Sequence, residues 1–399
     1  MNKRQEPRLR FKGFMETWEE KTLNDVSEIF EYGLNAQAVN FDGVHKYIRI
    51  TDIDDESRQF LQENVTSPDV DFSKADNYKL QKGDLLFART GASVGKSYLY
   101  NENDGLVYFA GFLIRAKLNK EVDDQFIFQN TLTNHFNRFV TLTSQRSGQP
   151  GINSKEYSEF EFLAPSLPEQ THLSLFFRRL DSQIAESRSV LEKSRQLKKA
   201  MLAKMFPANG EKTPKIRFKG FEGEWECRKL GDVVEIVMGQ SPSSTSYTDN
   251  PSDFILVQGN ADMKNGKVCP RVWTTECIRL GAAGDIVMSV RAPVGDVGKT
   301  DYDIVVGRGV CAIKGNEFIY QTLCKMKLDG YWNSLSSGST FEAINSNDVK
   351  NSEILIPIQE EQTAIGNFFR QLDETIALQS AEVEKLNQLK KGLLAAMLV

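Results

Sequence analysis

The chain has 399 residues, of which 40% are apolar and 26% are charged. This composition is typical of a globular protein with room for two or three domains, and it excludes a disordered chain. No apolar run approaches the ~20 residues that a bilayer-spanning helix needs, and the polar N-terminus shows no secretory signal. We therefore expect a cytoplasmic protein that does not enter a membrane.

The formal net charge is −5, with 49 basic and 54 acidic residues. An acidic chain does not bind polyanions indiscriminately, so any contact with nucleic acid must use local patches or charge that a partner supplies. The five cysteines all lie in the second half and form no CxxC pair. Neither a disulfide framework nor a zinc cluster is predicted.

The sequence repeats itself in two places. Residues 7–26 recur at 214–233 with 11 of 20 positions identical, and residues 169–206 recur at 361–398 with 19 of 38 identical. The intervening segments, 27–168 and 234–360, barely resemble each other. The chain is therefore two copies of one module, which share the repeated segments and differ in the segments between them.

The first repeat, named here the anchor segments 7–26 and 214–233, carries aromatic residues at matching positions. We expect Phe11, Phe14 and Trp18, with their second copies, to attach each segment to the body of its module, and contact with a partner is the alternative. After each anchor segment, short apolar runs alternate with Gly, Asn, Asp and Ser, which predicts strands and turns. Helices are predicted within these parts at 123–142 and 316–334, so each globular part is α+β.

The second repeat predicts two long helices. In 173–205 the residues at alternating steps of four and three form a heptad seam, with Pro168 just before the helix and Pro207 just after it. About 37 residues span roughly 55 Å, so the helix must pack on something long. An ordinary core-facing helix is the alternative for either stripe alone, but two matching stripes favour pairing of the two helices.

We therefore predict an α+β protein with two globular domains, related by a pseudo-two-fold and separated by two long, antiparallel, coiled-coil-like helices. The predicted boundaries are 1–168 for the first domain, 169–206 for the first helix, 207–213 for a linker, 214–360 for the second domain and 361–399 for the second helix.

The segment GASVGKS at 91–97 is similar to a phosphate-binding loop but has the wrong spacing. That loop needs four residues between its glycines, whereas three separate Gly91 from Gly95, and in the second module Pro293 stands where the leading glycine would be. Two interpretations stay open for the repeated GK[ST]: a strand turn with an exposed lysine, or a lysine on a DNA phosphate. The three histidines do not recur at aligned positions, so no duplicated histidine site is predicted. We predict no catalytic residue and no metal site.

Several polar loops carry the side chains that recognise base edges, namely Arg for guanine, Asn or Gln for adenine, and Ser or Thr for either. Any single one of them is also compatible with an ordinary hydrophilic turn. The predicted DNA contacts are Arg89, Thr90, Ser93, Lys96, Arg146, Gln149, Gln240, Ser241, Gln258, Asn260, Arg291, Lys299, Ser337 and Ser339.

Three patterns together resemble one known family. These are P-x-[LI]-R-F-x-G-F…W-E…L-x-D-V, the Lys82-Gly83-Asp84 and Gly284-Asp285 segments, and the duplicated E-Q-T…F-F-R-x-L-D…Q-L-K-K helix. Over nearly its whole length the chain resembles the specificity subunit of type I restriction–modification enzymes. The resemblance implies two target-recognition domains, each recognising one half of an asymmetric split DNA target, with the helices setting the gap.

The resemblance also implies partners. Two modification subunits would bind S-adenosylmethionine and methylate adenine, and two restriction subunits would hydrolyse ATP with Mg²⁺ and cut DNA, so this chain itself would carry no catalysis and no cofactor. The residues expected to bind these partners are Phe177, Leu180, Leu191, Lys198, Lys199, Phe369, Leu372, Lys390 and Lys391. The alternative from another class is a scaffold that binds no DNA and displays two adaptor domains on paired helices.

Overall fold

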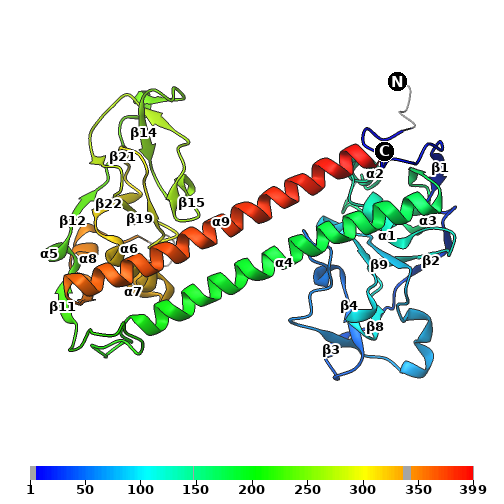
Figure 1. Ribbon diagram of the computed structural model, residues 1–399, viewed down its shortest axis with the longest axis horizontal. Helices are drawn as coiled ribbons and strands as arrows, with labels where there is room; N and C mark the ends of the chain where they lie inside the picture. The colour runs from blue at the N-terminus through cyan, green and yellow to red at the C-terminus, as the bar shows by residue number, and fades with distance from the viewer. Residues whose placement is uncertain (1–5, 147, 336–342, 399) are drawn as a thin grey trace. The chain divides into compact units, whose positions relative to one another are not determined.

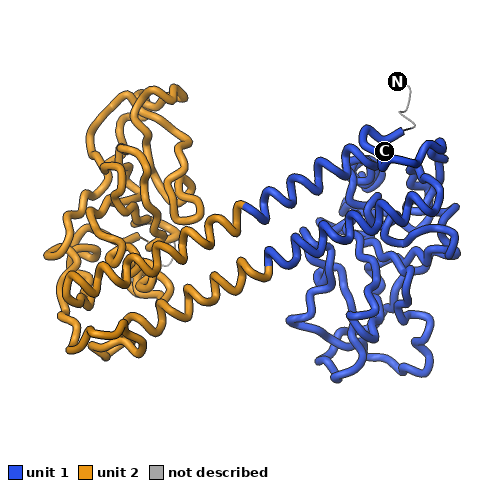
Figure 2. Tube along the Cα trace, viewed as in Figure 1, with its two compact units in different colours: residues 1–188, 382–399 blue, residues 189–381 orange. Residues whose placement is uncertain are grey.

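The structure is a computed structural model that describes residues 6–146, 148–335 and 343–398 (Figure 1). The chain divides into two compact units: unit 1 contains residues 1–188 and 382–399, and unit 2 contains residues 189–381 (Figure 2). Each unit therefore combines one globular part with a stretch of each long helix. Within the described ranges, no helix is long and apolar enough to cross a bilayer.

Unit 1 contains two four-stranded sheets, ordered β2-β9-β6-β7 and β3-β5-β4-β8, and the two-stranded pair β1-β10. Its strands are β1 (Glu19–Thr22), β2 (Ser27–Tyr32), β3 (Ala38–Asn40), β4 (Lys46–Ile48), β5 (Thr66–Pro68), β6 (Asp84–Ala88), β7 (Ser97–Leu99), β8 (Val107–Phe109), β9 (Leu113–Leu118) and β10 (Glu161–Ala164). Its short helices are α1 (Asp124–Asn130), α2 (Asn134–Thr143) and α3 (Ser154–Ser158). The sequence predicts one helix over 123–142, but the structure has two helices there, α1 and α2. The Thr133 hydroxyl accepts a 3.2 Å hydrogen bond from the Phe136 backbone N and starts a second helix.

Unit 2 also contains two larger sheets and one two-stranded pair, but its larger sheets have more strands than those of unit 1. A six-stranded sheet is ordered β12-β22-β19-β20-β16-β15, a five-stranded sheet is ordered β13-β17-β14-β21-β18, and β11 pairs with β23. The strands are β11 (Glu226–Lys229), β12 (Glu235–Met238), β13 (Tyr247–Thr248), β14 (Phe254–Val257), β15 (Met263–Lys264), β16 (Lys267–Val268), β17 (Trp273–Thr274), β18 (Leu280–Gly281), β19 (Ile286–Ser289), β20 (Val297–Lys299), β21 (Ile304–Val306), β22 (Val310–Lys314) and β23 (Glu353–Ile356). The short helices are α5 (Leu230–Val233), α6 (Glu317–Leu328), α7 (Tyr331–Leu335) and α8 (Ser346–Lys350). The helix predicted at 316–334 is interrupted at Gly330, whose φ of +74° favours glycine.

The two long helices are α4 (Leu167–Met205) and α9 (Gln359–Met397), each starting two residues before its predicted first residue. In unit 1 the beginning of α4 packs against the end of α9, and Asp181 Oδ1 lies 2.6 Å from Lys390 Nζ. In unit 2 the end of α4 packs against the beginning of α9, and Lys198 Nζ lies 2.6 Å from Asp373 Oδ1. The helices are therefore antiparallel within each unit, and the same two repeat positions form both ion pairs.

Each anchor segment is attached to the first turn of a long helix by a buried ion pair. Arg10 Nε donates to Glu169 Oε1 at 2.8 Å, and the Glu169 side chain is only 1% exposed. In unit 2, Arg217 Nε donates to Glu361 Oε1 at 2.7 Å. Both arginines also donate from Nη2 to the second carboxylate oxygen, so each bridge is bidentate.

Backbone bonds tie each anchor segment to the end of the other long helix as well. Leu9 N donates to Ala396 O at 2.9 Å in unit 1, and Ile216 N donates to Lys204 O at 2.9 Å in unit 2. The anchor tryptophans are buried, as the sequence predicts, and Trp18 lies edge-on to Phe126 at 6.2 Å. The beginning of one helix and the end of the other thus meet on the same short segment.

We expect Phe177→Ala to lower the free energy of unfolding by about 3–5 kcal/mol, because its ring is fully buried in the unit 1 core and truncation leaves a cavity. Urea unfolding followed by tryptophan fluorescence measures this. Leu175→Ala, an exposed position on the same part of α4, is the matched control and should change stability by no more than about 0.5 kcal/mol. Equal losses for the two variants would contradict the assignment of Phe177 to the core.

Candidate nucleic-acid interface

Two polar loops of unit 1, predicted separately from the sequence, lie side by side. The loop after β6 and the loop after α2 form a bridge between Thr90 and Gly151, with Gly91 N donating to Pro150 O at 2.9 Å. Gly91 has a φ of +71°, and a Cβ there would stand 2.9 Å from Gln149 Nε2. A glycine is therefore required where the loops meet, and the exposed Gln149 is brought next to the Arg89–Ser93 loop.

A buried tyrosine hydrogen-bonds to both ends of the loop after β6. Tyr157 Oη donates to Ala88 O at 2.7 Å and accepts from Gly95 N at 3.0 Å. Burial raises the pKa of Tyr157 well above its ordinary value, so the hydroxyl remains a donor at every physiological pH. The backbone from 88 to 95 is thereby fixed at both ends, which orients the side chains between them.

Two aromatic residues that the sequence did not single out lie next to Arg89. The Arg89 guanidinium stacks over the Tyr32 ring at 4.8 Å, and Arg89 N donates to Phe112 O at 3.0 Å. Tyr32 is the last residue of β2, and the 60% exposed Phe112 precedes β9. An aromatic beside a glycine at a strand end is a weak signal, and only the pairing of β2, β9 and β6 brings these three residues together.

Arg146 is engaged within the chain. Its guanidinium forms an ion pair with Glu156 and donates from Nη1 to Thr143 O at 3.0 Å, which closes the end of α2. The side chain is nevertheless 42% exposed. Arg146 therefore contributes charge to this face, while its hydrogen-bonding capacity is partly used for the fold.

The polar loops of unit 2 also converge. Gln240 N donates to Val306 O at 2.9 Å, and Gly307 N donates to Val257 O at 2.7 Å, which places the Gln240–Ser241 and Gln258 loops on either side of the Gly307–Gly309 turn. Val290 N donates to Gly309 O at 2.9 Å, so Arg291 follows directly beside them.

The turn itself carries an exposed arginine that sequence reasoning missed, Arg308, whose backbone N donates to Ser241 Oγ at 3.4 Å. An arginine between two glycines after an apolar strand was the available signal. Ser337 and Ser339 lie outside the described residues.

The two GK[ST] segments are not equivalent, contrary to their sequence likeness. Ser97 pairs with Phe87 on β6 and Val297 pairs with Met288 on β19, so the register aligns Gly95 with Gly295. Both glycines have positive φ, +84° and +80°. The structural counterpart of Lys96 is therefore Asp296, and Lys299 occupies another position.

Both lysines form ion pairs within their own domain. The Lys96 side chain is 8% exposed, lies 2.7 Å from Asp55 Oδ1, and donates to Ile53 O at 3.0 Å. Lys299 forms an ion pair with Glu317 and lies 4.5 Å from the Tyr320 ring centroid. Both lysines therefore join a loop or a helix to the sheet through ion pairs, and the DNA contacts predicted for them stay predictions.

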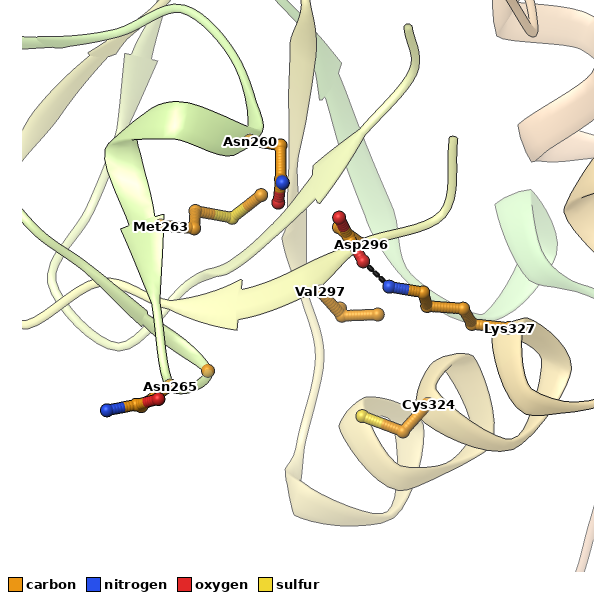
Figure 3. A pocket seen from close by; sticks show the side chains of 8 residues that line it. Asn260, Met263, Asn265, Asp296, Val297, Cys324 and Lys327 are labelled. Carbon is orange, nitrogen blue, oxygen red and sulfur yellow. Dashed lines mark ion pairs between the residues drawn. The ribbon is translucent and has the colours of Figure 1, made fainter. Parts of the chain in front are cut away.

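Unit 2 contains a hollow of about 300 Å³ lined in part by Asn260, Met263 and Cys324 (Figure 3). At its edge the Lys327 ammonium forms an ion pair with Asp296, and burial lowers the pKa of Lys327. Burial raises the pKa of the Cys324 thiol to about 11, so the thiol is protonated at neutral pH and is a poor nucleophile. Asn260 points toward this hollow. In the described part of the chain, no group of three or more His, Cys, Asp or Glu residues has a metal-binding arrangement.

Comparisons with known proteins decide the family. Residues 15–193 and 222–388 match the family model described as the type I restriction modification DNA specificity domain. The putative type I restriction enzyme MjaX specificity subunit of Methanocaldococcus jannaschii is 28% identical over 404 residues, covering 96% of this chain and 93% of that protein.

This chain belongs to the type I restriction–modification DNA specificity family.

Two solved structures share the fold at low sequence identity. The type I restriction–modification S subunit of M. genitalium has a TM-score of 0.68 at 15% identity, with 99% of both chains covered. A chain from a study of complex assembly and conformational transition of the type I system has a TM-score of 0.55 at 21% identity, covering 94% of this chain and 96% of that one. Both support the α+β fold with two long helices.

The family assignment confirms the predicted function at the level of the subunit. The protein is a DNA specificity subunit with two target-recognition domains, and it is a recognition subunit without catalysis of its own. The alternative of a scaffold unrelated to DNA is thereby rejected. The DNA contacts predicted for individual residues remain proposals, and they differ between the two domains.

Most residues expected to bind partner subunits contribute to the packing of the specificity subunit itself. Phe177 and Phe369 are fully buried, Lys198 and Lys390 form the helix ion pairs, and Leu372 is half-buried. Leu180 and Leu191 are 6% exposed each. These seven side chains are thus part of the interior or of internal ion pairs of this chain, and their contact with partner subunits stays a prediction.

Other helix positions remain exposed. Lys199 and Lys391, the other two residues expected to bind partner subunits, are on the surface. Leu197 and Leu389, which occupy equivalent positions of the repeat, are also exposed. The repeat thus presents the same leucine and lysine on both helices.

We expect Lys96→Met to lower the free energy of unfolding by about 1–3 kcal/mol, because the Ile53 carbonyl loses its buried donor. Lys82→Met, on an exposed position of the same domain, is the control and should change stability by no more than about 0.5 kcal/mol. The slope of DNA affinity against salt, measured on the assembled complex, should not change for Lys96→Met. A shallower slope would restore Lys96 as a phosphate contact.

Proposed function

We propose that this specificity subunit recognises an asymmetric, bipartite DNA target, with one half-site for each target-recognition domain, and that it assembles with two modification subunits and, in the complete enzyme, two restriction subunits. One observation carries the proposal: the two domains share backbone hydrogen bonds but have different side chains at equivalent positions. Arg89, Tyr32 and Phe112 of the first domain correspond to Val290, Met238 and Gly309 of the second.

This correspondence follows from hydrogen bonds that recur in both domains. Ile152 N donates to Arg89 O at 2.9 Å, and Ile344 N donates to Val290 O at 3.0 Å. Arg89 N donates to Phe112 O just as Val290 N donates to Gly309 O. Recurring backbone hydrogen bonds with different side chains support two half-sites of different sequence, and in this proposal the target is not a palindrome.

The partners follow from the charge and from the exposed helix residues. Many basic side chains are used in internal ion pairs, and the chain carries a net charge of −5. Phosphate contacts dominate DNA affinity, so partner subunits supply a share of the positive surface. In this proposal the modification subunits bind S-adenosylmethionine and methylate adenine, and the restriction subunits bind ATP and Mg²⁺. The complex acts on DNA in the cytoplasm.

Adenine methylation mapped in cells that express this chain with its modification subunit tests the proposal. The expected result is a split motif of two unlike half-sites separated by an unspecified gap. Exchange of residues 27–168 for the segment of another family member should change one half-site and leave the other intact. An unsplit or palindromic motif, or a change in both halves, would contradict the proposal.

The long helices give a second expectation, that helix length sets the gap. Seven residues added after Leu191 and seven after the equivalent Val383 preserve the heptad seam and lengthen each helix by about 10 Å, close to three base pairs. The methylated motif should keep both half-sites and gain about three positions between them. Replacement of seven residues without a change in length is the control, and an unchanged gap in the longer variant would remove this role.

A further inference from the structure

Arg89 occupies a rigid position at the end of a central strand. It follows β6, its backbone N donates to Phe112 O at 3.0 Å, and its O accepts from Ile152 N at 2.9 Å. The preceding residue, Ala88, is held by the buried Tyr157 hydroxyl at 2.7 Å. The Cα–Cβ direction of Arg89 is therefore fixed by three neighbouring segments, which is the rigid support that a recognition side chain needs.

The Arg89 side chain is also oriented. Its Cζ lies 4.8 Å from the centroid of the Tyr32 ring, and Nη1 makes one long 3.5 Å hydrogen bond to Gly111 O. Tyr32 is in turn fixed, because its hydroxyl accepts hydrogen bonds of 3.3 Å from both the backbone N and the Oγ of Ser154. The stacking restrains the guanidinium plane without using its N–H donors.

Arg146 and Arg115, two other arginines of the same domain, are paired with carboxylates, unlike Arg89 among the residues that the structure describes. Arg146 pairs with Glu156, and Arg115 pairs with Glu31 and Asp84. In the described ranges, the structure shows no carboxylate within ion-pair distance of Arg89. The neighbouring Phe112 exposes its ring at the same place. An oriented cation with open donors next to an exposed aromatic ring is the combination enriched at recognition surfaces.

We propose that Arg89 recognises a guanine of the half-site bound by the first target-recognition domain, through O6 and N7 in the major groove, and that Tyr32 is the residue that positions it. The planar guanidinium has two parallel donors that match these two acceptors, which no other base pair presents in that arrangement. This inference rests on the proposed function. Val290 and Met238 stand at the equivalent positions of the second domain, so the corresponding position of the other half-site is not recognised in this way.

Modified bases test the inference on the wild-type complex of this chain with its modification subunit. Replacement of the guanine by 7-deazaguanine removes the N7 acceptor and should weaken binding about 10- to 100-fold. Replacement by inosine, which keeps O6 and N7 and lacks only the minor-groove amino group, should leave affinity within about twofold. A half-site without guanine, or a larger effect of inosine than of 7-deazaguanine, would overturn the assignment.

Variants of Arg89 test the same contact from the protein side. Arg89→Ala should remove the difference between guanine and 7-deazaguanine and relax one position of one half-site in the methylation map, while the other half-site stays unchanged. Arg89→Lys keeps the charge but not the fork, and it should also lose the preference. A uniform loss of affinity for all sequences, with a salt slope shallower by about one, would instead assign Arg89 to a phosphate.

Tyr32 variants separate positioning from structure. Tyr32→Phe keeps the ring under the guanidinium and should retain the guanine preference, whereas Tyr32→Leu should reduce it at that position alone. Val290→Ala, at the equivalent place in the second domain, is the matched control and should leave the first half-site unchanged. Loss of both half-sites with Tyr32→Leu would mean a general structural role and contradict positioning. A wild-type complex that methylates no split motif would refute the proposed function itself, which distinguishes that failure from a failure of Arg89.

Discussion

The bidentate ion pair between an anchor arginine and the first turn of a long helix is the interaction on which the frame depends. Glu169 and Glu361 are almost fully buried, and each receives two hydrogen bonds from one guanidinium. A carboxylate in such a place is stable only with its partner, and removal of one partner of a buried pair costs about 3–5 kcal/mol. The same anchor segment then bonds to the end of the other helix through Leu9 in one unit and Ile216 in the other. Three segments far apart in the chain are thereby joined in each unit.

This frame explains how one architecture carries two specificities. The sheet hydrogen bonds, the asparagine N-caps of α3 and α8, and the glycines before β7 and β20 recur in both domains. The side chains that project from the connected loops do not recur. Because backbone groups hold the loops together, an exposed loop residue can change without loss of the fold. The divergence of 27–168 from 234–360 is therefore compatible with a common structure.

Charge is distributed in the same way. Arg10, Lys96, Arg115 and Lys198 are used inside the units, where they neutralise carboxylates and connect layers. Arg308 of the second domain is exposed and Arg89 of the first is half-buried, and each lies on a loop at a strand end. The use of basic side chains in internal ion pairs agrees with the acidic composition of the chain, which does not favour general attraction to DNA.

The internal repeat, the two long helices, the α+β class and the family were all evident from the residues alone. Helix periodicity and repeated identity are local properties, so α4 and α9 begin within two residues of their predicted starts. The same local patterns misled elsewhere. The GKS and GKT triplets have similar sequences, yet they are not structurally equivalent. The register of β7 on β6 and of β20 on β19 shows that the counterpart of Lys96 in the second domain is Asp296, not Lys299. The apolar seam of the helices could serve a partner or a core, and burial of Phe177 and Phe369 assigns it to the core. Likewise, Tyr32, Arg89 and Phe112 are 23 or more residues apart in sequence and become neighbours only when β2, β6 and β9 pair. Strand register and burial arise from contacts between distant segments, which no pattern of adjacent residues specifies, and these contacts decide which of the polar residues form a surface.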